Sequence, residues 1–136
     1  MKLELERTFK ASKEQLYALW TDPKTISQWF GVKVVIDPKV GGALNFDFGE
    51  KVLTSGTFKE LSPFDKVAFT WKSVTCSEGT EESTGDTLVT VTFEKISSDQ
   101  TQMRLVHSGF NTEAAKNDHN DGWTDYLAKW EKKFAT

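Results

Sequence analysis

A run of alternating apolar and polar residues between positions 32 and 109 constrains the fold more than any other feature of the sequence. Alternation with a period of two is typical of strands with one buried face, because successive side chains point to opposite faces of a sheet. Turn-forming pairs at Asp37-Pro38 and Ser62-Pro63 divide the run. The strands predicted here are 32–36, 43–49, 52–61, 66–71, 87–96 and 101–110. Their short connections indicate a mostly antiparallel meander.

Helical signals stand on either side of this run. After a first alternating segment at 2–9, residues 12–20 and 23–30 predict two short helices, each with apolar residues at helical spacing. Ser12 and Gln15 have the spacing of a capping box at the start of the first of them. Near the other end, apolar residues at i, i+3, i+4, i+7 and i+11 predict a long helix within residues 112–136. The residues of that stripe are Trp123, Tyr126, Leu127, Trp130 and Phe134.

Two polar segments are interpreted as loops: "SEGTEESTGD" at 77–86, and "KNDHNDG" just ahead of the apolar stripe of the long helix. The resulting order is one strand, two helices, six strands and one long helix. We therefore predict a single α+β domain over residues 1–136, with its helices packed on one face of a curved sheet. A chain of 136 residues suits one such domain.

Charge and cysteine content narrow the classes of partner and compartment. Lys and Arg total 17 against 20 Asp and Glu, without a long run of one sign, so neither nucleic acid nor an anionic membrane is expected as a partner. The single cysteine, Cys76, excludes an internal disulfide and fits a reducing compartment. The first residues do not resemble a signal peptide, and no stretch approaches the roughly 20 apolar residues that span a bilayer. We expect a soluble, cytoplasmic protein.

Several stretches, taken in order, resemble one known family. They are "LYALWTDPKTISQWF" (16–30), "VGGALNFDF" (40–48), "GTFKELSPFDKVAFTW" (56–71), "TLVTVTFE" (87–94), "TQMRLVHSGF" (101–110) and "GWTDYLAKW" (122–130). With the order of elements, they resemble the START-like (SRPBCC) superfamily and, within it, the family of the activator of Hsp90 ATPase homologue. The resemblance implies a helix-grip fold, in which a curved antiparallel sheet of about six to seven strands wraps a long C-terminal helix and leaves a cavity between them.

The aromatic residues form the candidate ligand site. They make up 12% of the chain, and the resemblance implies that some of them line the cavity between sheet and helix. The predicted ligand-contacting residues are Trp29, Phe46, Phe48, Phe69, Trp71, His107, Phe110, Trp123, Tyr126 and Trp130. Filling an ordinary core is the competing interpretation for each of them.

His107 is the main polar candidate. It shares a predicted strand face with Met103 and Leu105, so we expect it to face inward, either as a ligand contact or as a hydrogen-bonded structural residue. Arg7 lies on the apolar face of the first strand, where it holds an anionic ligand group, extends its charged end into water, or pairs with a carboxylate across the sheet. No catalytic residue is predicted.

No chemistry is predicted for the other polar groups of the sequence. Asp118, His119 and Asp121 match no defined metal-site spacing, so no metal is predicted. No glycine-rich phosphate loop with its lysine is present in the sequence, and no cofactor is predicted. Cys76 has no evident partner and is interpreted as non-catalytic.

We therefore expect a protein that binds a small hydrophobic, aromatic-containing molecule between its sheet and its C-terminal helix. Two alternatives stay open, because one fold hosts many activities. The first is a chaperone-related protein-interaction module, with a chaperone as partner. The second is a cyclase-like or hydrolytic enzyme that works in the cavity.

Overall fold

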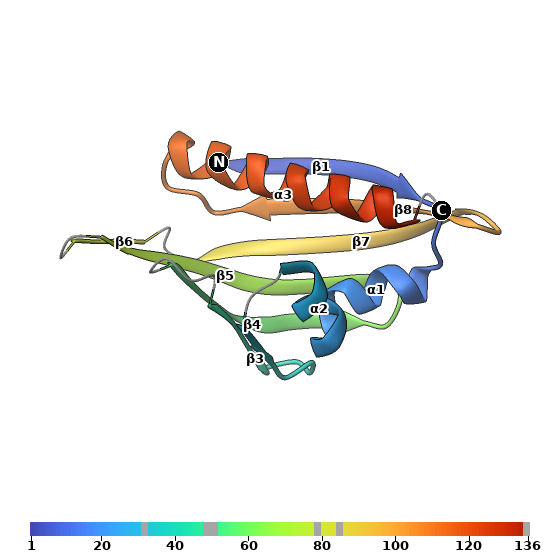
Figure 1. The fold of residues 1–136 in the computed structure, drawn as a ribbon, viewed down its shortest axis with the longest axis horizontal. Helices are drawn as coiled ribbons and strands as arrows, with labels where there is room; N and C mark the ends of the chain where they lie inside the picture. The colour runs from blue at the N-terminus through green and yellow to red at the C-terminus, as the bar shows by residue number, and fades with distance from the viewer. Residues whose placement is uncertain (31–32, 48–51, 78–79, 84–85, 135–136) are drawn as a thin grey trace.

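The computed structural model describes residues 1–30, 33–47, 52–77, 80–83 and 86–134; within these ranges, the side chains of 27–30, 52, 75–77 and 80–83 are not described. Helices and strands follow one another in the predicted order, with one strand more (Figure 1). Their bounds are β1 (Lys2–Phe9), α1 (Lys13–Thr21), α2 (Pro23–Phe30), β2 (Lys33–Ile36), β3 (Ala43–Asp47), β4 (Val52–Ser62), β5 (Lys66–Ser77), β6 (Thr80–Ser83), β7 (Thr87–Ser97), β8 (Gln100–Ser108) and α3 (Glu113–Phe134).

The strands form one antiparallel sheet in the order β1-β8-β7-β5-β4-β3-β2, and β6 pairs with β5 outside this path. The first strand pairs with the last, with Leu5 opposite Leu105, and these two strands form one edge of the sheet. A register shift between Phe58 and Glu60 marks a bulge in β4, and such bulges increase the bend of a sheet. The predicted α+β fold with a curved antiparallel sheet and a long C-terminal helix is confirmed.

The predicted loop at 77–86 is wrong for residues 80–83, while residues 78–79 and 84–85 lie outside the described residues. Residues 80–83 form β6, which pairs with the end of β5 and makes a hairpin that projects from the sheet (Figure 1). The prediction failed because hairpin pairing depends on backbone hydrogen bonds, which a polar sequence makes as well as an apolar one. Hydrophobic periodicity therefore cannot detect a strand whose residues are all polar.

The three helices cover one face of the sheet (Figure 1). Helix α1 begins with the predicted capping box: the Ser12 hydroxyl accepts a hydrogen bond from the Gln15 amide at 3.1 Å, and the Gln15 side chain accepts one from the Ser12 amide at 2.9 Å. Helix α3 runs beside β1, which it approaches more closely than any other strand. Among the described residues, no helix is long and apolar enough to cross a membrane.

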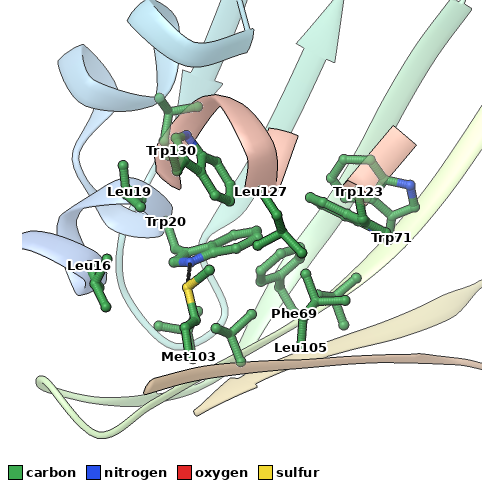
Figure 2. Packing of buried hydrophobic residues seen from close by; sticks show 14 of the residues in the cluster. Leu16, Leu19, Trp20, Phe69, Trp71, Met103, Leu105, Trp123, Leu127 and Trp130 are labelled. Atoms are coloured by element: carbon green, nitrogen blue, oxygen red, sulfur yellow. Dashed lines mark hydrogen bonds between the residues drawn. The ribbon is translucent and has the colours of Figure 1, made fainter. Parts of the chain in front are cut away.

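Trp20, at the end of α1, lies at the centre of the core and joins α1 to α3 and to the sheet. Its ring centroid lies 5.3 Å from that of Trp130 and 5.5 Å from that of Trp123. Its indole N–H points at the sulfur of Met103 on β8, 3.4 Å away (Figure 2). Helix α3 therefore packs on the sheet through large rings, with Trp20 as the common neighbour.

We expect Trp20→Ala to lower the free energy of unfolding by about 3–5 kcal/mol, because it removes a buried indole and leaves a cavity under α3. Urea denaturation followed by circular dichroism measures this loss. Val35→Ala is the control: Val35 is 62% exposed, and we expect a change within about 0.5 kcal/mol. A loss below about 1 kcal/mol for Trp20→Ala would contradict its central role.

Candidate ligand site between the sheet and the C-terminal helix

The structure brings together all the predicted ligand-contacting residues whose side chains it describes. Their rings make one continuous series of contacts, with centroid separations of 4.4–6.4 Å. The contacting pairs are Phe46–Trp71, Phe69–Trp71, Trp71–Trp123, Trp71–His107, His107–Phe110, His107–Trp123, Trp123–Tyr126 and Tyr126–Trp130. The side chain of Trp29 and the whole of Phe48 lie outside the described residues.

Strand alternation and one sharp turn place these rings. On β8, Met103, Leu105 and His107 all point inward and are buried, as their period of two predicts. The chain then turns at Gly109, whose φ of 92° falls in the left-handed region that glycine adopts readily. The Gly109 and Phe110 amides both donate to the Met1 carbonyl, which holds the turn against the start of β1.

The hydrogen bonds of His107 define its tautomer. Its ring is fully buried, and its Nδ1 lies 3.0 Å from the indole nitrogen of Trp123. An indole N–H can only donate, so Nδ1 carries no proton and accepts. The other nitrogen, Nε2, lies 2.6 Å from the Thr87 hydroxyl, which itself donates to the Trp71 carbonyl. Nε2–H therefore donates to Thr87, and the imidazole is neutral.

Burial, with a smaller effect of the neighbouring His119, lowers the pKa of His107 from 6.5 to about 3. A proton added to Nδ1 would also point at the Trp123 N–H and break that hydrogen bond. Both nitrogens are already used, so His107 is unsuited to act as a general base toward a substrate. This geometry favours the structural interpretation of His107 and gives no support to catalysis.

His119, which the sequence reasoning dismissed as a loop residue, belongs to the same group. Its Nε2 accepts a hydrogen bond from the Trp71 indole at 3.2 Å, and its Nδ1–H donates to the Ala115 carbonyl at 2.8 Å. Its ring centroid lies 5.2 Å from those of both His107 and Phe110. We call Trp71, His107, Phe110, His119 and Trp123 the indole–imidazole cluster.

The interpretation of "KNDHNDG" as a loop is wrong, because these residues lie within α3. The helix begins at Glu113, close to the start of the predicted range 112–136. There the Thr112 hydroxyl accepts a hydrogen bond from the Ala115 amide at 3.1 Å, which satisfies one of the free amides of the first turn. A usable signal was present, since His119 precedes Trp123 by four residues and so extends the inward stripe by one turn.

The hydrogen bonds of the cluster run in both directions between the sheet and α3, and its rings are closely packed. A strand indole, Trp71, donates to a helix imidazole, and a helix indole, Trp123, donates to a strand imidazole. The described rings are closely packed, because Trp71 is 5% exposed, Trp123 3% and Trp130 0%. Tyr126 is only partly buried, and that burial raises the pKa of its phenol. These residues therefore pack as ordinary core residues do, and a ligand that binds among them has to displace one of the rings.

Arg7 pairs with a carboxylate, but that carboxylate lies on a helix and not across the sheet, as one of the predicted alternatives expects. Its Nε lies 3.3 Å from a Glu131 oxygen on α3, at the other end of the helix from the cluster. Beside this pair is a shallow groove of about 210 Å³, which includes Phe9, Phe134 and Lys10 in its lining. Among the described residues, no group of three or more His, Cys, Asp or Glu side chains is placed to hold a metal ion. The side chain of Cys76 lies outside the described residues.

The curved antiparallel sheet, the paired short helices and the long helix over its inner face define a START-like domain of the SRPBCC type. The chain belongs to the family described as "Activator of Hsp90 ATPase homolog 1-like protein", whose model matches residues 10–134. No curated protein matches the chain.

Solved structures from distant organisms share this fold. An Hsp90 activator from Plasmodium falciparum has a TM-score of 0.78 and 25% identity, over 94% of this chain and 91% of that one. A protein from Mesorhizobium loti has a TM-score of 0.82 and 22% identity, over 97% and 95% of the two chains. The Aha1 dimer from Colwellia psychrerythraea has a TM-score of 0.76 and 19% identity, over 98% and 96%. The last two likenesses concern the fold alone.

We expect the stability of the protein to fall with acid through His107. The pKa of this residue is lower in the folded than in the unfolded chain, so its stabilising contribution is complete above pH 6.5 and is lost as the pH falls toward about 3. The loss from this group is at most about 1.4 kcal/mol per pH unit. Urea denaturation at several pH values between 7.5 and 4 measures it.

His107→Gln is the comparison, because an amide can also accept from Trp123 and donate to Thr87 yet does not titrate. We expect this variant to be less stable at pH 7.5 but to lose less free energy of unfolding per pH unit than the wild type. Equal pH slopes in the two proteins would show that the buried imidazole does not govern acid stability.

Proposed function

We propose that the protein binds a small, uncharged, aromatic-containing molecule between its sheet and α3, at the indole–imidazole cluster. The observation that carries this proposal is the convergence of rings from β3, β5, β8 and α3 on one place between sheet and helix. Small-molecule sites in proteins are predominantly apolar and aromatic, with a few placed polar groups. The single cysteine fits a reducing compartment, so we also propose that this binding takes place in the cytoplasm.

The way α3 packs supports this place for a ligand. The helix approaches β1 most closely, and its contacts with β5 and β8 run through long side chains such as Trp123. Each indole at such an interface covers roughly 150–250 Å² of surface. An apolar surface of that size is large enough to cover one face of a flat molecule.

The chemistry of the cluster favours an uncharged ligand. His107 is neutral, and His119 accepts from Trp71 through an unprotonated nitrogen, so neither imidazole offers a positive charge. The remaining members of the cluster are aromatic rings. An ionised ligand would lose its hydration here without gaining an opposite charge, which is costly in a buried site.

A pair of naphthalene dyes tests this proposal. We expect the uncharged N-phenyl-1-naphthylamine to bind saturably with quenching of tryptophan fluorescence, and to raise the melting temperature. The anionic 1-anilinonaphthalene-8-sulfonate, of similar shape, should bind at least tenfold more weakly, because the difference of one desolvated charge is worth about 1.4 kcal/mol or more.

Two variants locate the dye. Trp123→Phe keeps an aromatic ring but removes the indole N–H, and we expect it to weaken binding of the uncharged dye by about 5- to 30-fold, since it lacks roughly 1–2 kcal/mol of contact. Phe64→Ala is the control, because Phe64 is an exposed ring in the turn between β4 and β5. Binding that is lost in Phe64→Ala and kept in Trp123→Phe would place the dye on the surface and contradict the proposal.

A second candidate function is a chaperone-directed interaction. The 25% identity over 94% of the chain with a structure described as an Hsp90 activator favours it. Val35 on β2 and Leu53 on β4, exposed by 62% and 54%, lie on the sheet face turned away from the helices and are apolar side chains that such a partner can contact.

We expect this candidate, if correct, to accelerate ATP hydrolysis by an Hsp90-family chaperone. Leu53→Ser should reduce the acceleration without lowering the melting temperature, since the side chain is exposed. An ATPase rate that does not change at saturating protein would dismiss the chaperone candidate and leave the ligand proposal untouched.

A further inference from the structure

Helix α3 has two halves of different character. Trp123, Leu127 and Trp130, in its second half, are buried. In the first half none of residues 113–122 is buried, and its inward contacts come from the partly buried Ala115 and His119. The second half is therefore anchored in the core, whereas the first half only covers the edge of the indole–imidazole cluster.

The helix is intrinsically weak where the two halves meet. Residues 117–121 are Asn, Asp, His, Asn and Asp, all poor helix formers, and Gly122 follows them. Glycine inside a helix costs about 0.5–1 kcal/mol relative to alanine. Packing does not require it here, because a Cβ added at Gly122 would meet nothing within 4 Å.

A hydrogen bond within the same turn weakens the helix further. The Thr124 hydroxyl donates to the Asn120 carbonyl at 2.7 Å, four residues earlier. Such bonds from threonine to the i−4 carbonyl compete with the backbone ladder and often accompany a bend. The glycine, the run of poor helix formers and this bond all fall between residues 117 and 124.

We propose that residues 113–121 form a lid, hinged at Gly122, that opens to uncover the indole–imidazole cluster. When closed, the lid is held by the hydrogen bond from Trp71 to His119 and by the contact of His119 with Phe110. Opening breaks these contacts of His119, whereas Trp123 stays on the anchored half of the helix. That the lid admits a ligand rests on the proposed function; that it opens does not.

Hydrogen exchange of the unliganded protein tests the lid directly. We expect the amides of 113–121 to exchange at least about tenfold faster than those of 123–134, because they open locally. Gly122→Ala should slow exchange of 113–121 by about two- to fivefold, since alanine favours the closed helix. Asp125→Ala, which raises helix propensity at an exposed position of the anchored half, is the matched control and should leave the lid rate unchanged.

The rate at which the protein takes up N-phenyl-1-naphthylamine tests whether the lid admits a ligand. We expect Gly122→Ala to slow association and dissociation by the same factor as exchange, with an unchanged dissociation constant, because the closed state is the same with and without dye. Equal exchange rates in both halves of α3, or equal slowing of lid exchange by Gly122→Ala and Asp125→Ala, would overturn the hinge.

The hydrogen-exchange experiment and the dye-uptake experiment can fail independently of each other. If the dye does not bind, the proposed function falls and the exchange data alone decide the lid. If the dye binds and Gly122→Ala slows exchange but not uptake, the lid opens without admitting the ligand, and its role as a gate is overturned.

Discussion

The hydrogen bond from Trp123 to His107 sets the conditions that the rest of the helix–sheet interface must meet. Because an indole N–H has no acceptor capacity, the imidazole has to present an unprotonated nitrogen, and its single proton must go to the other side. That proton reaches Thr87, whose own hydroxyl continues to the Trp71 carbonyl. One side chain of α3 is thereby connected to β8, β7 and β5 through a single ordered chain of donors and acceptors.

A buried chain of this kind specifies one arrangement strongly. In a low-dielectric interior each hydrogen bond is stronger than in water, and each unmade one is more costly. Rotating α3 or sliding it by one turn would leave the Trp123 donor and the His107 acceptor unpaired inside the core. Aromatic packing alone tolerates such shifts, because rings meet favourably over a broad range of offsets. The polar chain therefore fixes the register of the helix, and the rings supply most of the buried area.

Local rules were sufficient to predict the fold and the inward-facing rings. Period-two alternation placed His107 beside Met103 and Leu105 on the buried face, and capping spacing placed the start of α1. The same rules missed β6 and His119, because a polar hairpin and a polar helical turn are stabilised by pairing and by continuity with a stronger neighbour, which composition does not register. The directions of the hydrogen bonds could not be predicted from the sequence either, since they depend on partners that come from four separate elements.

The division of α3 explains how one set of residues can serve both the fold and a ligand. A pocket built wholly from core rings would have to break the core each time it was used, and stability is too small to allow that cheaply. Here the rings that carry the fold, Trp123 and Trp130, belong to the anchored half, whereas the contact made by His119 belongs to the half that is weakly helical and never fully buried. Opening at Gly122 uncovers one edge of the cluster and leaves the hydrogen bond between Trp123 and His107 intact, so the register of the helix survives.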